Sequence, residues 1–219
     1  MKYYAFMLAV ICISVFLLQL SFPITDEFVL ISKDVLSRPW ILVTSIFLHD
    51  PYEYNPNSMQ YQVSFQHLVY NMIALVLFGL ILESIIGSKK FLIIFFITGI
   101  IASIGSAFFY EASLGASGAI MGIIGALAIL RPKMMIYVPF GFIPPMPMIV
   151  AAGLWALIDL AGMFYPSQTA NAAHLFGLGA GVVIGLVLRE KFSARTKKRE
   201  KILTERDVDK WEDEYMRCV

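Results

Sequence analysis

Charged side chains are rare or absent over long stretches of this chain, and this spacing is the strongest constraint on its fold. A membrane-crossing helix needs about 20 apolar residues, because each residue adds about 1.5 Å and the hydrocarbon layer is about 30 Å thick. The candidate helices cover about 4–22, 66–86, 91–110, 117–130, 146–164 and 170–188. The sequence therefore predicts an all-α membrane protein with six transmembrane helices and a long first external loop over about 23–65.

The composition agrees with a membrane protein and argues against two other classes. Of the 219 residues, 58% are hydrophobic and 15% are charged, whereas soluble domains carry about 25% charged residues. An apolar excess of this size does not fit inside one small soluble core. The net charge of +1 argues against nucleic acid as a partner, so the lipid bilayer is the expected surrounding.

Basic residues are distributed unevenly between the two sides of the predicted bundle. With six spans both termini lie on one side, which then carries 15 of the 17 Lys and Arg residues and leaves Lys33 and Arg38 on the other. The positive-inside rule places the termini in the cytoplasm. We expect residues 1–188 to form the membrane domain and 189–219 a charged cytoplasmic tail. The scarcity of sorting signals favours a prokaryotic plasma membrane.

The first apolar stretch has two interpretations, an uncleaved anchor and a cleaved signal peptide. Lys2 precedes an apolar run, as it does in signal peptides. The run is long for that purpose, however, and Ser21-Phe22-Pro23 does not provide the small residues of a cleavage site. We therefore favour the anchor.

The fourth apolar stretch begins with a segment that resists helix formation, from Ala112 to Gly118. Ser117 opens the helix and Arg131 ends it about 14 residues later, so the helix measures only about 21 Å. The preceding chain must then descend into the membrane, where irregular backbone is tolerated only against protein or water. Ser117 is thus expected at a helix N-terminus facing a hydrated pocket, where unpaired N–H groups suit a developing oxyanion.

His174 lies about one turn into the sixth predicted helix, at a depth similar to that of Ser117. Glycines recur on both helices at the spacing that lets membrane helices approach closely. They are Gly118, Gly122 and Gly125 on one helix and Gly177, Gly181 and Gly185 on the other. Packing of these two helices would bring the Ser117 hydroxyl within hydrogen-bond distance of the imidazole, and a serine with an imidazole base is a nucleophile for acyl transfer.

His67 and Asn71 are four residues apart and therefore share one face of the second predicted helix, near its outer end. Both side chains can donate to an oxyanion. Taken singly, each polar residue has a simpler interpretation, since a membrane serine usually bonds its own helix and a lone histidine usually joins two helices. Their shared depth, where the helix start is broken, favours one outward-opening pocket.

These residues and their order resemble the rhomboid family of intramembrane serine proteases. Three motifs carry the resemblance: GxSG as Gly115-Ala116-Ser117-Gly118, AHxxGxxxG from Ala173 to Gly181, and HxxxN from His67 to Asn71. The resemblance implies that Ser117 is the nucleophile and His174 the general base. The implied oxyanion donors are Asn71, His67 and the Ser117 backbone N–H. The glycines with implied packing roles are Gly115, Gly118, Gly122, Gly177 and Gly181.

The sequence departs from the family pattern in three places. The stretch from Trp40 to His49 resembles the family's first outer loop, which ends in a structural histidine, but Ile41 replaces its arginine. The segment over 50–66 is long for the family. Met121 stands where some members carry an aromatic residue that stacks on the base. These differences affect the loop and the orientation of the base rather than the Ser–His pair.

Two acidic residues fall inside predicted spans. Glu83 matches a structural acid of the family and is too close to the cytoplasmic side for catalysis. Asp159 is the only acid near the level of His174. A third group often orients a catalytic histidine, but the family works with a Ser–His dyad. A contact of Asp159 with the outer loop or with water is therefore favoured over a triad.

The function implied by the resemblance is hydrolysis of peptide bonds in or next to the transmembrane helices of membrane-protein substrates. No CxxC motif or His/Cys cluster indicates a metal, and no cofactor is expected. An inactive rhomboid-like binder of membrane helices, acting in quality control, is the main alternative. A lipase would need GxSxG, which fails at Ala119, and a channel or transporter lacks support because no inverted repeat is evident.

Overall fold

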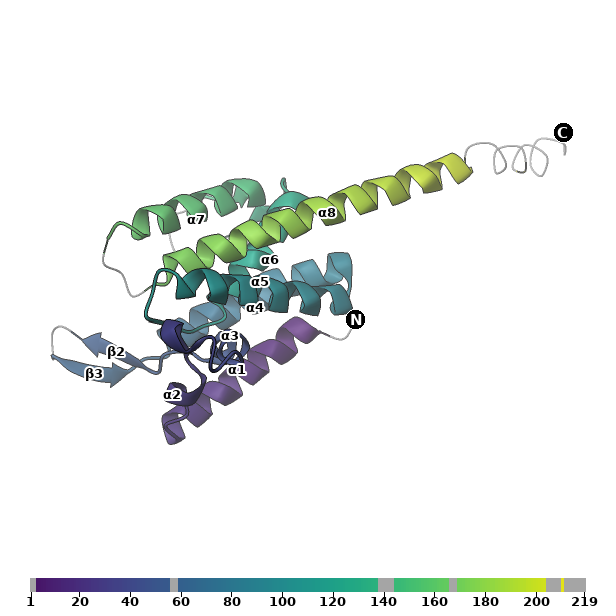
Figure 1. The fold of residues 1–219 in the computed structure, drawn as a ribbon. Coiled ribbons are helices and arrows are strands. Elements are labelled where there is room, and N and C mark those ends of the chain that lie inside the picture. The colour runs from purple at the N-terminus through teal and green to yellow at the C-terminus, as the bar shows by residue number, and fades with distance from the viewer. Residues whose placement is uncertain (1–2, 56–58, 138–143, 166–168, 204–209, 211–219) are drawn as a thin grey trace.

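Helices packed side by side dominate the computed structural model, which describes residues 3–55, 59–137, 144–165, 169–203 and 210 (Figure 1). The main helices are α1 (Tyr4–Ser21), α4 (Gln66–Ile86), α5 (Ser88–Ala107), α6 (Ser117–Leu130), α7 (Met148–Gly162) and α8 (Asn171–Leu203). Their positions match the predicted stretches, and α6 begins at the expected residue. Length and composition qualify α1, α4, α5 and the first 20 residues of α8 to cross a membrane, whereas α6 and α7 are shorter apolar helices.

Short elements in the connections were not part of the all-α prediction. The helical ones are α2 (Thr25–Phe28), η1 (Ser32–Asp34), α3 (Ile41–Thr44) and η2 (Ser45–Phe47). The antiparallel strand pairs are β1 (Leu30–Ile31) with β4 (Ala112–Ser113), β2 (Tyr52–Asn55) with β3 (Gln60–Val63), and β5 (Met135–Ile136) with β6 (Met146–Pro147). Loop backbone needs hydrogen-bond partners, and the β1–β4 pair meets this need by joining the loop after α1 to the segment that leads into α6.

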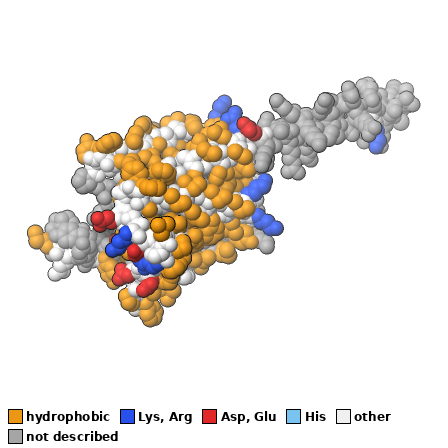
Figure 2. Space-filling view, viewed as in Figure 1, with side chains coloured by type: hydrophobic (Ala, Val, Ile, Leu, Met, Phe, Trp, Pro, Cys, Tyr) orange, Lys and Arg blue, Asp and Glu red, His pale blue; other side chains and the backbone are white. Residues whose placement is uncertain are grey.

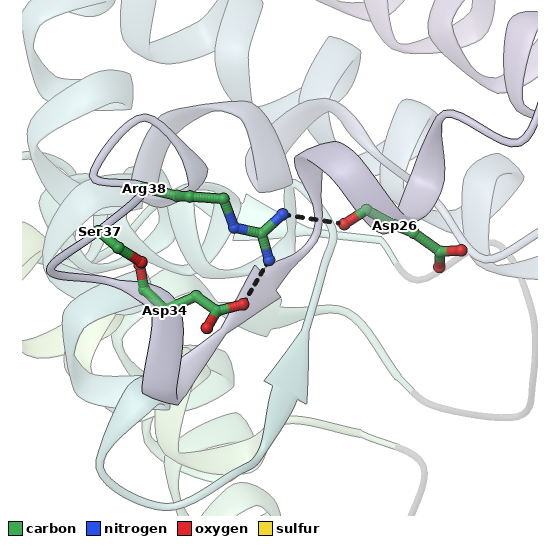
Figure 3. Close-up of polar contacts among 4 residues, drawn as sticks. All are labelled: Asp26, Asp34, Ser37 and Arg38. Atoms are coloured by element: carbon green, nitrogen blue, oxygen red, sulfur yellow. Dashed lines mark hydrogen bonds and ion pairs between the residues drawn. The ribbon is translucent and has the colours of Figure 1, made fainter.

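The described part of the segment between α1 and α4 makes its own polar contacts. Arg38 forms an ion pair with the side chain of Asp34 and donates to the backbone oxygen of Asp26 at 3.3 Å (Figure 3). The same loop fixes the start of α6, because the N–H of Gly115 donates to the backbone oxygen of Ser45 at 2.9 Å.

Helices α6 and α8 form the centre of the bundle through direct backbone contact. A Cβ atom added to Gly177 would lie 2.0 Å from the backbone oxygen of Gly118, and one added to Gly181 would lie 1.9 Å from that of Gly122. No side chain fits into such gaps. In the structure the two helices thus approach each other at these glycines.

The face of the bundle shown in Figure 2 is largely apolar, with charged side chains gathered toward its two ends. Large exposed apolar side chains of the bundle include Phe6, Leu17, Ile93, Leu157 and Val183. Water-soluble monomers rarely expose continuous apolar surface of this kind. The band fits a hydrocarbon layer, and the ends fit the aqueous phases on either side of it.

Glu83 joins the C-terminal end of α4 to the start of α1. Its side-chain oxygens accept hydrogen bonds from the backbone N–H groups of Tyr4, at 3.0 Å, and Ala5, at 3.1 Å. A carboxylate is stabilised by the unpaired N–H groups and positive potential of a helix N-terminus. Glu83 therefore holds α4 against the start of α1, which agrees with the structural role implied by the resemblance.

Helix α8 continues without a break past position 188, where the membrane domain was expected to end, to Leu203. The added residues are rich in Lys, Arg and Glu, which are good helix formers. The helix extends well beyond the bundle (Figure 1). Of the predicted tail, 204–209 and 211–219 lie outside the described residues.

Candidate active site

Ser117 lies at the first position of α6 because the preceding backbone makes a turn that favours glycine. Gly115 has a φ of 120°, a value that residues with a side chain rarely adopt. A Cβ atom there would also lie 3.0 Å from both Cε1 and Nε2 of His67. The glycine of the GxSG motif thus allows the chain to pass close to His67 and present Ser117 to the space between the helices.

His174 comes from the first turn of α8 and meets Ser117 directly. The distance between His174 Nε2 and Ser117 Oγ is 2.8 Å, a good hydrogen-bond length for a hydroxyl that donates to a neutral imidazole. One turn further along α8, Gly177 makes the backbone contact with Gly118. The close approach of the two helices therefore produces the predicted meeting of serine and histidine.

Asp159, from the C-terminal part of α7, meets the other nitrogen of the same imidazole. Its Oδ1 lies 2.9 Å from His174 Nδ1, and its side chain is buried. The sequence favoured a contact of Asp159 with the outer loop or water, and the structure instead places it on the histidine. Since a carboxylate only accepts, the hydrogen belongs on Nδ1 and Nε2 is left as the acceptor for Ser117.

His67 and Asn71 line the same cavity from the first two turns of α4. Asn71 Nδ2 donates one hydrogen bond to the backbone oxygen of His67 at 2.8 Å. An amide group has two donor hydrogens, so one remains for the cavity. The structure thus places around one cavity the four polar side chains that the sequence assigned to the pocket, although Asn71 also bonds its own helix.

The cavity between the helices has a volume of about 830 Å³. Its walls come from α4, α6, α7, the start of α8 and the outer loop, and its lining includes Ser117, His174 and Asp159 together with apolar side chains such as Trp155 and Met121. A space of this size lies in the range of small-molecule and peptide sites. A second cavity, of about 20 Å³, adjoins Ser117 among small and hydroxyl side chains and has room for about one water molecule.

His49 supports the site from the outer loop. It is fully buried, its ring centroid lies 5.1 Å from that of His67, and its backbone N–H donates to Gln19 Oε1 at 3.0 Å. Burial, with a smaller contribution from His67, lowers the pKa of His49 to about 3, so the ring is neutral at physiological pH. Its place at the end of the first outer loop was the only signal in the sequence for this structural role.

Comparison with known proteins identifies the family of this chain. The Rhomboid domain family model matches residues 56–191, which is more than half of the chain. The chain belongs to the rhomboid family. The matched region of this rhomboid includes Asn71, Ser117, Asp159 and His174. Family membership and the apolar helices identify an integral, multi-pass membrane protein.

Curated relatives include plant, bacterial and yeast rhomboids. The chain is 31% identical over 162 residues to RHOMBOID-like protein 6, mitochondrial, of Arabidopsis thaliana, covering 69% of this chain and 44% of that protein. It is 33% identical over 155 residues to Rhomboid protease AarA of Providencia stuartii, covering 60% of this chain and 54% of that protein. It is 26% identical over 189 residues to Rhomboid protein 1, mitochondrial, of Saccharomyces cerevisiae, covering 80% of this chain and 49% of that protein. The chain thus spans about half the length of these relatives.

Proposed function

We propose that this rhomboid is an intramembrane serine endopeptidase that hydrolyses peptide bonds in or next to the transmembrane helices of membrane-protein substrates. Ser117 is the nucleophile and His174 the general base. The observation that carries the proposal is the 2.8 Å contact between Ser117 Oγ and His174 Nε2 beside a large cavity. Relatives that are named rhomboid proteases support it at the level of the family.

The reaction follows from the donors and acceptors at this contact. Ser117 Oγ attacks the substrate carbonyl carbon while its proton passes to His174 Nε2. The imidazolium then gives that proton to the leaving amine, the C–N bond breaks, and an acyl-enzyme remains. His174 next takes a proton from water, which attacks the ester and releases the carboxylic acid with regeneration of the serine hydroxyl.

The oxyanion is stabilised at the start of α6. The first N–H groups of a helix have no partner within the helix, and the Ser117 N–H lies beside the carbon under attack. The free hydrogen of the Asn71 amide and the ring of His67 are the further donors in this proposal, because both side chains line the cavity. Such donors act on charge that develops in the transition state.

Access to the substrate backbone imposes a requirement on the substrate. In a helix each carbonyl accepts the N–H four residues ahead, so a carbonyl must leave this arrangement before Ser117 attacks it. Substrates should therefore carry helix-weakening residues, such as Gly, Pro or small polar residues, near the cut. The cavity of about 830 Å³ accommodates a short unwound segment and the water that hydrolysis consumes.

The topology in this proposal has six spans, with the short helices α6 and α7 completing the set. Both termini lie in the cytoplasm of a prokaryotic cell, and the active site opens to the external side of the plasma membrane. Support comes from the 15 basic residues that share one side of a six-span arrangement. Residues 1–188 form the membrane domain, and 189–219 form the cytoplasmic tail.

The test is cleavage of a purified single-span substrate in detergent and in liposomes, with the products identified by mass spectrometry. Wild type is expected to cut near the helix-weakening residues, whereas Ser117→Ala and His174→Ala should leave the substrate intact while unfolding at the wild-type temperature. A serine-reactive fluorophosphonate should label only proteins that retain Ser117. Cleavage by Ser117→Ala would contradict the proposal, and substrate binding without cleavage or labelling in wild type would indicate the inactive binder.

A further inference from the structure

We propose that Asp159 is a positioning residue for the general base, so that this rhomboid works with a Ser–His–Asp arrangement in place of a dyad. The inference rests on the proposed function, because it assigns a role to the partner of His174. Its basis is the pair of contacts on the His174 imidazole. Nδ1 lies 2.9 Å from Asp159 Oδ1, and Nε2 lies 2.8 Å from Ser117 Oγ.

The first step of the argument concerns the tautomer. A neutral imidazole carries one hydrogen, and the base is competent only when Nε2 is free to accept from the serine. The carboxylate of Asp159 accepts from Nδ1 and therefore selects that tautomer. The same contact prevents rotation of the ring away from Ser117.

The second step concerns charge. When Ser117 Oγ forms its bond to the carbonyl carbon, its proton moves to His174 Nε2 and the ring becomes a cation. The Nδ1 hydrogen stays in place and donates to a carboxylate, so the new positive charge lies next to a fixed negative one. In a buried site this contact is stronger in the transition state than in the resting enzyme.

The third step concerns the burial of α7 around Asp159. Between Gly153 and Gly162, Asp159 is the only residue that the structure buries. Neighbouring side chains such as Leu157 and Ile158 are exposed, with 63% and 65% of their surface accessible. A buried carboxylate is costly without a partner, and its contact with His174 both satisfies it and holds this part of α7 to α8.

A matched control is available at the same junction. Asn171 is a buried polar residue at the start of α8, and its amide lies against α7, since a Cβ atom on Gly162 would be 2.7 Å from its Nδ2. It does not line the main cavity. Asn171→Ala therefore weakens the α7–α8 junction without removing the contact with His174.

The experiment compares Asp159→Asn and Asn171→Ala with wild type and Ser117→Ala in the single-span cleavage assay, below the unfolding temperature of every variant. Removal of the carboxylate from a catalytic triad costs about 10⁴ in rate, and we expect Asp159→Asn to lower kcat by about 10² to 10⁴ with KM within about threefold. Asn171→Ala should keep kcat within about threefold. The rate of fluorophosphonate labelling should fall with kcat.

Formate provides a second readout, which a purely structural role would not affect. In Asp159→Ala, added formate should occupy the vacated space, accept from Nδ1 and raise kcat at least about fivefold, while chloride at equal ionic strength should not. If Asp159→Asn does not fold, the formate experiment on Asp159→Ala serves as the test of the positioning role.

The outcomes separate the two proposals. If Ser117→Ala is inactive but Asp159→Asn retains wild-type kcat, the positioning role is wrong and the dyad stands. Equal losses in Asp159→Asn and Asn171→Ala, without rescue by formate, would likewise reduce Asp159 to a packing contact. Activity in Ser117→Ala would instead remove the proposed function itself.

Discussion

Two parts of the bundle hold the same histidine in very different ways. Helix α6, which carries Ser117, is 14 residues long and buries 11 of them, and it touches α8 backbone to backbone. Helix α7, which carries Asp159, is 15 residues long and buries four. Nucleophile and base are therefore fixed by close packing, whereas the carboxylate comes from a helix with few other attachments. The alignment of the base depends on both, and only one of them is packed backbone to backbone against α8.

The largest expected effect comes from disrupting the close contact between α6 and α8. Gly181→Ala should abolish cleavage and lower the unfolding temperature, because the new Cβ would lie 1.9 Å from the backbone oxygen of Gly122 and a backbone atom cannot move without shifting its helix. Gly179→Ala, on the same helix, is the control, since no atom lies within 4 Å of its added Cβ. Cleavage and thermal unfolding would be measured for both. Normal activity in Gly181→Ala would disprove the rigid α6–α8 contact.

The next effect tests the α4 wall of the cavity. Asn71→Ala should lower kcat by about 10² to 10³, the usual cost of one oxyanion donor, while KM changes little. The control is Ile73→Ala, which removes an exposed side chain from the same helix and should leave kcat unchanged. Steady-state cleavage kinetics distinguish the two. An unchanged rate for Asn71→Ala would remove its donor role and leave the Ser117–His174 pair untouched.

The outer loop gives a smaller effect, which depends on pH. The pKa of His49 is lowered to about 3 from about 6.5 in an unfolded chain, so between these values only the unfolded chain takes up a proton. The free energy of unfolding should thus be at its full value above about pH 6.5 and decrease toward pH 3, by up to about 1.4 kcal/mol per pH unit. Unfolding in detergent at several pH values measures this slope, and a slope in His49→Gln equal to that of wild type would contradict the assignment.

The smallest effect is expected in α7, the helix with fewer buried residues. Gly153 lies in α7, and no atom lies within 4 Å of an added Cβ. Gly153→Ala should keep kcat within about threefold and raise the free energy of unfolding by at most about 1 kcal/mol, because Ala is a better helix former than Gly. The same assays as for Gly181→Ala apply. A severe loss of activity would mean that α7 is packed far more closely than its exposure indicates.

The sequence predicts the helices well, because membrane spans are read from apolar length and from breaks in it. The start of α6 at Ser117, the glycine contacts with α8 and the meeting of Ser117 with His174 all follow from depth and spacing. The number of spans does not follow from helix length in the structure, since α6 and α7 are short. The strand pairs were also missed, because pairs of two to four residues leave no pattern.

The partner of His174 shows the limit of depth arguments. Depth along the membrane is one coordinate, and it correctly placed Asp159 near the level of the base. The rotation of α7 about its own axis is a second coordinate. Because α7 is apolar on nearly every side, the periodicity of its sequence does not predict which side chains face α8. The same limit applies to Asn71, whose bond to its own helix depends on a rotamer.

Helix α8 is a single rod of 33 residues, which at about 1.5 Å per residue is about 50 Å long. His174 stands near one end, and the other end extends well beyond a hydrocarbon layer of about 30 Å. The glycine contacts with α6, at Gly177 and Gly181, lie between these ends and close to His174. The base therefore lies within two turns of a junction where backbone touches backbone, and far from the end of α8 that extends beyond the bundle (Figure 1).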